Sequence, residues 1–480
     1  MSFSKFASKS NAAWAVMILT AGCSVGPNYK PPVTAVPASW NEAQQSAFAT
    51  GLAPLTDWWT EFNDPLLNML VERAVQSNLD LRLAEARIRE SRALRSVTAS
   101  DAWPQLDAAG TYARSRSSEN AISRGGGESS SFGANGARDL FRAGFDASWE
   151  IDIFGGVRRR VEAADANVAA AVEERRNALV TLLGDVARNY IELRGFQRRL
   201  TVARSNLHAQ QETLDLTRVR FEAGLSSDFE VAQAEGQVNT TAAQIPALES
   251  AFKGSVHRLD VLLGQQPGTL GAELSNEAPV PALPPQAHVG LPAELLRRRP
   301  DIRRAERVLA AATAQVGAAT ADLFPRFSLT GAFGFQSIHA GDLVSSPSRF
   351  WSIGPTILWP VFDAGRIRAN IAVRDAQQEQ ALTLYEKTVL TAFEDVENSL
   401  VNYAKEQIRY RALIDAVAAN RRAVQMANEL YTRGLIDFLN VLETQRSLYA
   451  SESELAQSET IMASNLVALY KAFGGGWETD

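Results

Sequence analysis

The sequence predicts an α+β membrane protein in which short β-hairpins are joined to unusually long helical hairpins, and in which several copies close into one ring. Three observations carry this prediction. The sequence repeats itself internally, it contains a stretch from Arg366 to Arg433 with neither glycine nor proline, and several short segments alternate apolar with polar residues. Such strands and helices in one repeated unit indicate two stacked layers, one of strands and one of helices.

The composition indicates a folded protein and excludes some functions. Of the 480 residues, 46% are apolar and 21% are charged, which is typical of globular domains. The formal net charge of −6 provides no overall positive field for nucleic acid. An arginine-rich stretch at 297–307 is interrupted by Asp301 and Glu306, and we expect it to be a solvated, salt-bridged face.

The sequence indicates no catalytic centre and no metal site. None of its histidines is grouped with cysteine or carboxylates at the spacing of metal ligands. Only five methionines are present, so a thioether relay for copper is not supported. We therefore expect no enzymatic activity and no cofactor other than a covalent lipid. The histidines are His208, His257, His288 and His339.

The N-terminus has the features of a secretory signal. Residues 1–22 contain two lysines, no acid and an apolar core too short to span a bilayer, and they are followed by Cys23, the only cysteine. A cysteine directly after Gly22 predicts a lipoprotein signal, with an acylated Cys23 as the first mature residue; the alternative is a free cysteine inside an ordinary signal. No later stretch reaches the ~20 apolar residues of a transmembrane helix, so strands would have to cross a membrane.

An internal repeat organises the rest of the chain. A first shift of the sequence along itself, which places Asp80 on Asp301, superposes eight identities within 31 positions. A second, slightly shorter shift then holds without a gap from Gly155/Gly365 to Gly264/Gly474. The chain therefore reads as two copies of one unit, joined by a linker rich in proline and glycine at 265–292. The identities under the first shift are Asp80/Asp301, Arg82/Arg303, Ala84/Ala305, Glu85/Glu306, Ala93/Ala314, Asp101/Asp322, Pro104/Pro325 and Gly110/Gly331.

Each copy contains one very long helical segment. The 68 residues from Arg366 to Arg433 would form a helix about 100 Å long. Apolar residues recur in it at alternating steps of four and three, which predicts coiled-coil packing. Both long helices should end at a glycine, Gly224 or Gly434, and return segments follow, with a kink expected at Pro246. The periodic residues of the second copy are Val389, Phe393, Val396, Leu400, Tyr403, Tyr410, Ile414, Val417, Val424 and Tyr431.

The strand segments have a period of two. Between Phe141 and Ile151 apolar residues alternate with polar ones, and similar patterns occupy 326–336 and 351–359, with a weaker one at 105–114. Each copy therefore supplies one hairpin, closed by a polar loop at 115–138 or 339–348. Strands with one apolar face and tryptophans at their ends indicate an outer-membrane barrel; the alternative is a soluble, half-buried sheet.

These elements require an oligomer. Four strands cannot close a transmembrane barrel, because the smallest barrels have about eight strands and an open edge in lipid leaves backbone groups unpaired. A helical hairpin of this length also cannot bury its apolar stripe alone. One ring of several copies satisfies both requirements and gives a β-barrel stacked on an α-helical tube.

The sequence thus predicts six segments in order. They are a signal peptide (1–22), an extended lipid-anchored segment (23–63), a first repeat (64–264) with a β-hairpin at about 104–152 and a helical hairpin at about 156–263, the linker (265–292), a second repeat (293–474) with a β-hairpin at about 325–362 and a helical hairpin at about 364–473, and a tail (475–480).

Short motifs extend over nearly the whole mature chain. They are Gly22-Cys23-Ser24-Val25-Gly26-Pro27-Asn28-Tyr29, Trp58-Trp59 with Phe62-Asn63-Asp64-Pro65, Asn78-Leu79-Asp80-Leu81-Arg82, Gly290-Leu291-Pro292, Arg298-Arg299-Pro300-Asp301-Ile302 with Ala305-Glu306, Asp322-Leu323-Phe324-Pro325, and Gly474-Gly475-Gly476-Trp477. With these motifs the chain resembles the outer-membrane efflux proteins, which are TolC-like, in their lipoprotein (NodT-type) branch.

The resemblance implies an architecture and a function. It implies a homotrimer with a twelve-stranded outer-membrane barrel, a long periplasmic α-barrel and a mixed equatorial region, lipid-anchored in the outer membrane. It also implies a channel for small molecules such as drugs or toxic compounds, with a periplasmic adaptor and an inner-membrane pump, of the resistance-nodulation-division type, as partners. In such lipoproteins, a serine after the acylated cysteine is usual for those sorted to the outer membrane, and Ser24 fits this.

The resemblance also assigns a gate. In the family, the periplasmic end is pinched by the return helix of the second copy, which places a hydrophobic ring at Leu439 and an acidic ring at Glu443, where the family usually has aspartate. The first copy has Phe229 and Gln233 at these positions, with an acid at Glu230 instead. From spacing alone, Leu439 would be an ordinary packing residue and Glu443 a solvated one.

Further residues are assigned around the helical tips. Tyr431, with Phe229 and Glu230, is a secondary gate or tip candidate. The turns at Gly224, Leu225, Gly434 and Leu435 are expected to contact the adaptor.

Two other functions share part of the pattern. A periplasmic coiled-coil adaptor would also have helical hairpins and a lipid anchor, but it would lack membrane strands and a double repeat. A duct for secreted proteins would share every feature, and only the companion pump separates it from small-molecule efflux.

Overall fold

The computed structural model describes residues 24–42, 48–50, 56–116, 137–284 and 287–477. Two compact units contain these residues, and each is assembled from separate stretches of chain. The first unit comprises Met1–Pro32, Arg89–Ala169 and Arg307–Thr383, and the second Val33–Ile88, Ala170–Glu306 and Leu384–Asp480. The predicted signal peptide, Cys23 and most of the 115–138 loop lie outside the described residues.

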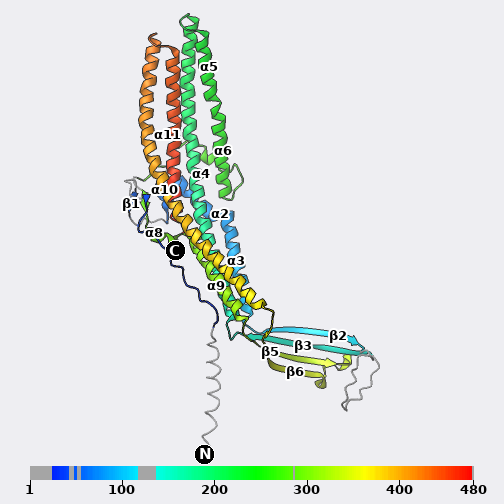
Figure 1. Cartoon of the computed structure of the whole chain (residues 1–480). Helices are drawn as coiled ribbons and strands as arrows, with labels where there is room; N and C mark the ends of the chain where they lie inside the picture. Colours follow the sequence, from blue (N-terminus) through cyan, green and yellow to red (C-terminus); the bar gives the residue numbers. More distant parts are fainter. Residues whose placement is uncertain (1–23, 43–47, 51–55, 117–136, 285–286, 478–480) are drawn as a thin grey trace, which may run out of the picture. The chain divides into compact units, whose positions relative to one another are not determined.

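The first unit contains a four-stranded antiparallel sheet (Figure 1). Its strands are β2 (Gln105–Ser115), β3 (Arg138–Ile151), β5 (Arg326–Ser337) and β6 (Arg349–Leu358), in the order β2-β3-β5-β6. Two successive hairpins are therefore joined by pairing between β3 and β5. The other edges of β2 and β6 have no strand partner among the described residues of the chain.

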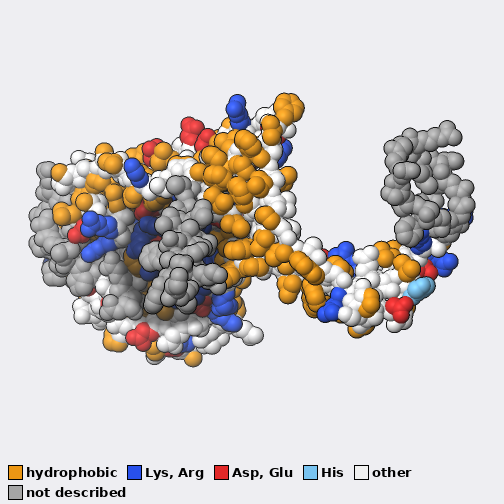
Figure 2. Space-filling view, turned by 90° about the horizontal axis from the view of Figure 1, so that it is seen from below, with side chains coloured by type: hydrophobic (Ala, Val, Ile, Leu, Met, Phe, Trp, Pro, Cys, Tyr) orange, Lys and Arg blue, Asp and Glu red, His pale blue; other side chains and the backbone are white. Residues whose placement is uncertain are grey.

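The register places the apolar residues of all four strands on one face. Phe145 stands opposite Ala108 and Phe333, and Phe333 stands opposite Trp351. Phe145, Phe333 and Trp351 are 52%, 51% and 74% exposed, so this face is uncovered in the single chain. The predicted alternation is confirmed. Hydrophobic side chains are exposed on the side of the molecule that Figure 2 shows.

The two hairpins have the same internal register. Gln105 pairs with Ser148, and their counterparts under the first and second shifts, Arg326 and Leu358, pair with each other. A tryptophan indole closes each hairpin onto the chain before it. Trp149 donates to the Ala102 carbonyl at 2.9 Å, and Trp359 donates to the Leu323 carbonyl at 3.0 Å. The second repeat shift relates the two tryptophans, and the first repeat shift relates the two carbonyl residues, so the two hydrogen bonds are equivalent in the repeat.

Two helices of 67 residues each continue from the hairpins. They are α4 (Gly156–Glu222) and α10 (Arg366–Thr432), and α10 occupies the predicted breaker-free stretch. Gly224 and Gly434 have φ of 71° and 73°, the left-handed conformation that glycine adopts without strain. The next amide donates to the carbonyl five residues back in each case, so both long helices end in the predicted glycine cap.

The return segments differ between the two halves of the chain. After Gly434 the chain forms the single helix α11 (Phe438–Ala472), whereas after Gly224 it forms α5 (Asp228–Ala242) and α6 (Gln244–Leu262), interrupted at Ala243. Proline lacks an amide hydrogen, so Pro246 cannot donate to the carbonyl of Ala242. The break predicted at Pro246 is therefore present just before it.

Shorter elements complete the described chain. None of the helices in the described residues is both long and apolar enough to cross a membrane. The remaining elements are β1 (Phe48–Thr50), which pairs in parallel with β4 (Ala287–Val289), the short helices η2 (Trp58–Phe62), η4 (Ala340–Asp342) and η5 (Ser346–Ser348), and the helices α2 (Pro65–Ser77), α3 (Leu79–Ser100), α7 (Gly271–Leu274), α8 (Pro292–Arg298) and α9 (Pro300–Ala321).

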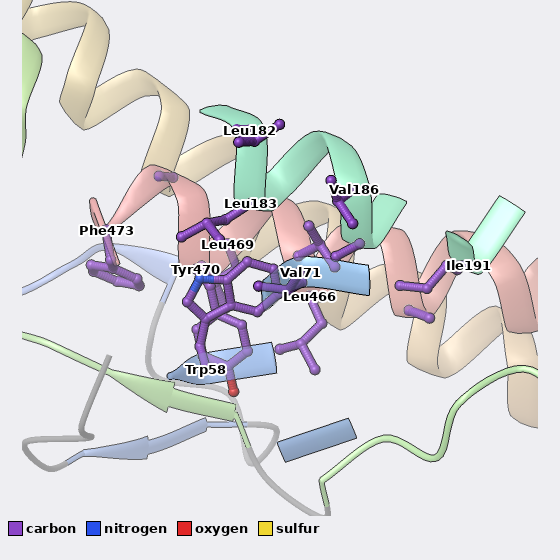
Figure 3. Close-up of a cluster of buried hydrophobic side chains, with 14 of the residues drawn as sticks. Trp58, Val71, Leu182, Leu183, Val186, Ile191, Leu466, Leu469, Tyr470 and Phe473 are labelled. Atoms are coloured by element: carbon purple, nitrogen blue, oxygen red, sulfur yellow. The ribbon is translucent and has the colours of Figure 1, made fainter. Parts of the chain in front are cut away.

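The core of the second unit packs around Trp58 (Figure 3). The Trp58 ring is 1% exposed and stacks on the ring of Tyr470 at 5.5 Å. Tyr470 donates a hydrogen bond to the Glu61 carboxylate. Burial raises the pKa of Tyr470, and the Glu61 hydrogen bond raises it further, so this hydroxyl stays protonated.

The predicted coiled-coil positions are buried only along part of each helix. Val186, Tyr190, Val396 and Leu400 are fully buried, whereas Ile414 is 44% exposed. An exposed apolar residue in a helical stripe needs another helix to cover it. The single chain therefore leaves part of its coiled-coil surface uncovered.

Candidate functional site at the helical tips

The tips are two turns that reverse the chain between long helices. Ser227 caps α5, because its side chain accepts a hydrogen bond from the Glu230 amide, whereas the Asp437 side chain makes no such bond to α11. Both turns belong to the second unit, and a small apolar core lies beneath them. This tip core consists of Leu214, Ala234, Ala427, Tyr431, Phe438, Val441 and Leu442.

Tyr431 connects the two hairpins. Its side chain is 3% exposed, and its ring packs against Phe438 at 5.6 Å between centroids. The Tyr431 hydroxyl donates to Glu230 Oε2 at 3.4 Å, and Ser226 donates to the same oxygen at 2.5 Å. Tyr431 on α10 is thus held by residues that follow α4 in the chain.

Arg220 completes this contact from α4. Its guanidinium carbon lies 4.6 Å from the centre of the Tyr431 ring, which is a cation–π geometry. Arg220 also donates to the Thr432 carbonyl at 3.4 Å. Tyr431 and Glu230 were selected from the sequence, but Arg220 was missed, because no periodic or spacing signal distinguishes this arginine from other arginines on the helix.

Leu439 and Glu443 lie outside the tip core. Leu439 is 54% exposed, although its neighbour Phe438 is 1% exposed, and Glu443 is also exposed. Four residues apart on α11, they share one helix face. Leu439 is therefore not a packing residue within its own chain, in contrast to the expectation from spacing alone. The acidic and apolar groups are free to meet another molecule or another copy.

The first hairpin presents a different pair. Phe229 is 69% exposed, whereas the Glu230 carboxylate is engaged by Ser226 and Tyr431. Leu225 and Leu435, one residue beyond the two glycines, are 68% and 65% exposed. The tips thus carry exposed apolar side chains at their apex, which is the type of surface that binds a protein partner.

A bound metal ion would require a cluster of suitable side chains among the charged residues of the described chain. No group of three or more histidine, cysteine or acidic side chains suited to a metal ion occurs in the described parts of the chain. His208 does have a carboxylate one helical turn away, which was overlooked in the sequence: it lies 3.7 Å from Glu212, and both side chains are more than 70% exposed. An exposed pair of this kind is an ordinary surface contact.

The arginine-rich stretch at 297–307 forms ion pairs, as predicted. Arg299 donates to Asp301 at 2.6 Å and to Asp395 at 2.9 Å, and Arg303 pairs with Glu173 at 2.8 Å. Burial alone would lower the pKa of Arg299, but the hydrogen bonds and charges of the two aspartates raise it above its usual value. This cluster is a structural ion-pair network of the second unit.

The chain matches a family model over most of its length. The model described as outer membrane efflux protein matches residues 70–265 and 291–475. Nodulation protein T of Rhizobium leguminosarum bv. trifolii is 33% identical over 460 residues, which is 96% of each chain. The toluene efflux pump outer membrane protein TtgI of Pseudomonas putida is 32% identical over 479 residues, which is 97% of each chain.

A solved structure has the same fold. The outer-membrane channel OprN superposes on this chain with a TM-score of 0.88 and 38% sequence identity, over 95% of this chain and 100% of that one. At this identity and coverage, the sequence motifs and the three-dimensional arrangement indicate the same class of protein.

Proposed function

Because the chain belongs to the outer membrane efflux protein family, it is an outer-membrane efflux channel, and we propose that three copies form the exit duct of a tripartite system. A periplasmic adaptor and an inner-membrane pump, of the resistance-nodulation-division type, would deliver the cargo. The observation that carries the proposal is the sheet, whose apolar face is exposed and whose two edges are unpaired in the described chain.

Three copies resolve the problem of the open edges. A strand edge in lipid leaves amide and carbonyl groups without partners, so membrane strands must close into a barrel. Four strands are too few for closure, and three copies of β2-β3-β5-β6 supply twelve. The apolar face would then contact lipid, and the polar face would line the duct.

The shared register of the two hairpins predicts how neighbouring copies pair. Within the chain, Asp146 of β3 stands opposite Ala332 of β5. Applying the two repeat shifts to this pairing places Thr356 of β6 opposite Thr111 of the partner subunit. Both threonines lie on the polar face, because Thr111 pairs with Arg142 and Thr356 pairs with Ser328. In the proposed pairing of β6 with β2 of the neighbouring copy, polar residues therefore lie beside polar residues.

Disulfide trapping tests the trimer and its register. Opposed residues in neighbouring strands have Cα atoms close enough for a disulfide. A chain carrying both Thr111→Cys and Thr356→Cys should give covalent trimers on oxidation, whereas the pair Ala113→Cys and Thr356→Cys should not. Trimers linked mainly by the second pair would indicate a register displaced by two residues, and a monomer by native mass measurement would refute the shared barrel.

The cargo is proposed to be small organic molecules. One relative in Pseudomonas putida is named for toluene efflux, and one in Pseudomonas aeruginosa for pyoverdine export. A deletion strain should accumulate such compounds and recover on complementation. Loss of a secreted protein without any change in small-molecule accumulation would favour the alternative, a duct for protein secretion.

Lipid anchoring remains a proposal based on the sequence. The single cysteine after the apolar core motivates it. Mass spectrometry of the mature N-terminus should show acylated Cys23. An unmodified peptide that begins at another residue would refute the lipid anchor and leave the channel proposal untouched.

The periplasmic gate is proposed at Leu439 and Glu443. Their exposure within the chain supports this, because side chains that close a mouth must face the axis and the other copies. Three carboxylates around an axis repel one another unless cations or water separate them, so this ring should attract cations. Three leucines one turn away would form an apolar collar that disfavours water.

Conductance in planar bilayers tests the gate. Replacing Glu443 with Gln should weaken cation selectivity or cation block, and replacing Leu439 with Ala should raise the resting conductance. Leu435→Ala, at an apex residue that is 65% exposed against 54% for Leu439, serves as the control and should leave both unchanged. If the double gate variant conducts and selects like the wild type, the constriction lies elsewhere, at Glu230 or at the Gly434 turn.

A further inference from the structure

The start of the described chain lies in a binding site built by other parts of the first unit. The Val25 amide donates to the Phe154 carbonyl at 3.1 Å, in the turn between β3 and α4. Arg159, whose side chain is 4% exposed, donates to the Val25 carbonyl at 3.2 Å, the Gly26 carbonyl at 3.4 Å and Asn28 Oδ1 at 2.6 Å. One buried arginine thus contacts three residues of the N-terminal segment.

Glycines allow the backbones to approach closely at this site. A Cβ atom on Gly26 would lie 2.5 Å from the Cα of Gly317 on α9, and a Cβ on Gly155 would lie 2.9 Å from Ser24 Oγ. Gly26 and Gly155 also have φ of 85° and 83°. A Cβ on Gly317 would lie 2.9 Å from Arg159 Cδ. Any side chain at these positions would displace the segment or the arginine.

Within the part of the chain that the structure describes, this site occurs once, although the elements around it occur twice. The position of Arg159 is occupied by Ala369 after the second repeat shift, and the position of Gly317 is occupied by Ser96 after the first. An arginine at the position of Arg159 and a glycine at the position of Gly317 are therefore not needed to form the hairpin or the long helix. These residues differ between the halves at the place where residues 24–28 bind.

We propose that Phe154, Gly155, Arg159 and Gly317 form a binding site, the N-terminal cradle, for the strap formed by residues 24–28 of the same chain. Arg159 is the positioning residue: it fixes the strap against the turn where the sheet passes into α4. Charge-assisted hydrogen bonds from one guanidinium to several acceptors give a defined orientation.

The consequence is a fixed origin for the membrane anchor. Ser24, the residue that follows the proposed lipidation site, lies against Gly155 in the turn after β3. A lipid attached immediately before Ser24 would therefore be held near the end of β3, where the proposed barrel meets the periplasm. This role rests on the proposed lipidation, but the binding of the strap does not.

Hydrogen exchange of the full-length protein in detergent tests the cradle. The probe is the exchange rate of the Val25 amide, with amides of β3 as an internal reference. Gly317→Ala should speed Val25 exchange at least tenfold and leave β3 unchanged, although alanine is the better helix former. Gly236→Ala on α5, where a Cβ meets no atom within 4 Å, is the matched control and should change neither rate.

Arg159 variants provide an independent arm. Arg159→Gln removes the charge and the guanidinium donors, so it should speed exchange of the Val25 amide as Gly317→Ala does. Arg159→Lys retains a charge and one donor group, so it should give an intermediate exchange rate. Val25 exchange within twofold of wild type in both Gly317→Ala and Arg159→Gln would overturn the proposal. Equal acceleration of Val25 and β3 would also overturn it, because the residues would then stabilise the whole unit and not the strap.

The same samples separate this proposal from the proposed function. If native mass measurement shows no trimer in the wild type while Val25 is protected, the shared barrel fails and the cradle stands. If the N-terminus carries no lipid but Val25 is protected, only the anchoring role of the cradle fails.

Discussion

Replacing Tyr431 tests whether the tip core holds the two hairpins together. In Tyr431→Ala, the ring that packs on Phe438 and under Arg220 is lost, together with the hydroxyl that donates to Glu230. In Tyr431→Phe, only the hydroxyl is lost. Comparing the two variants separates the contribution of the ring from that of the hydrogen bond.

The two substitutions are expected to destabilise the tip by very different free energies. Truncating a buried aromatic residue to alanine costs about 3–5 kcal/mol, and we take about 3 kcal/mol here because partly exposed neighbours can collapse into the space. The hydroxyl should contribute only about 0.5 kcal/mol, because its bond is 3.4 Å long and Glu230 keeps its 2.5 Å bond to Ser226. Since about 1.4 kcal/mol is tenfold in an equilibrium, Tyr431→Ala should open the tip about a hundredfold more often and Tyr431→Phe about twofold.

Hydrogen exchange of tip peptides measures this opening, and resting conductance in planar bilayers measures its effect on the channel. Leu435→Ala removes an exposed apex side chain and is the control, with an expected change below about 0.5 kcal/mol. If Tyr431→Ala leaves exchange at residues 427–442 within threefold of wild type, the tip is held by other contacts and the assignment of Tyr431 is wrong.

Three further variants, of which Arg188→Leu is a control, test the second unit by urea unfolding. Arg299→Leu should lower the free energy of unfolding by about 2 kcal/mol, reduced from the usual cost because Asp301 and Asp395 are 26% and 46% exposed; Arg188→Leu, at an exposed pair, should cost less than about 1 kcal/mol. Burial raises the pKa of Glu459, so the folded state binds its proton more tightly and stability falls as pH rises above the usual carboxyl range. Glu459→Gln should abolish this fall and be at least as stable as wild type at pH 7, and a less stable variant would refute the sign.

The elements with strong periodicity could be predicted from the sequence. The absence of glycine and proline located α10, and alternation located β3 and β5, because both signals are local properties of the chain. The parallel pair β1 and β4 was not predicted. Each strand has three residues, and one precedes the first repeat whereas the other lies in the linker between the repeats, so neither pattern nor proximity along the sequence reveals the pairing.

The site was predictable only in part. Leu439, Glu443 and Tyr431 were assigned by resemblance, and the structure shows which of them is packed and which are exposed. Arg159 and Arg220 were missed. Each acts on residues distant in the sequence, Arg159 on Asn28 and Arg220 on Tyr431, and a single arginine within a helix carries no signal of its distant partner.

The tips show how one repeated unit acquires different roles. Tyr431 corresponds to Phe221 under the second repeat shift, yet Tyr431 is 3% exposed and Phe221 is 44% exposed. Arg220 and Glu230 correspond to Leu430 and Asn440, which cannot supply the same charges. The contact among Arg220, Tyr431 and Glu230 therefore exists once per chain, between its own two hairpins. In the proposed ring, this interface between the two hairpins of one chain would alternate with an interface between hairpins of neighbouring copies. The second kind of interface would lack the contact among these three residues, so different interactions would hold the two kinds together.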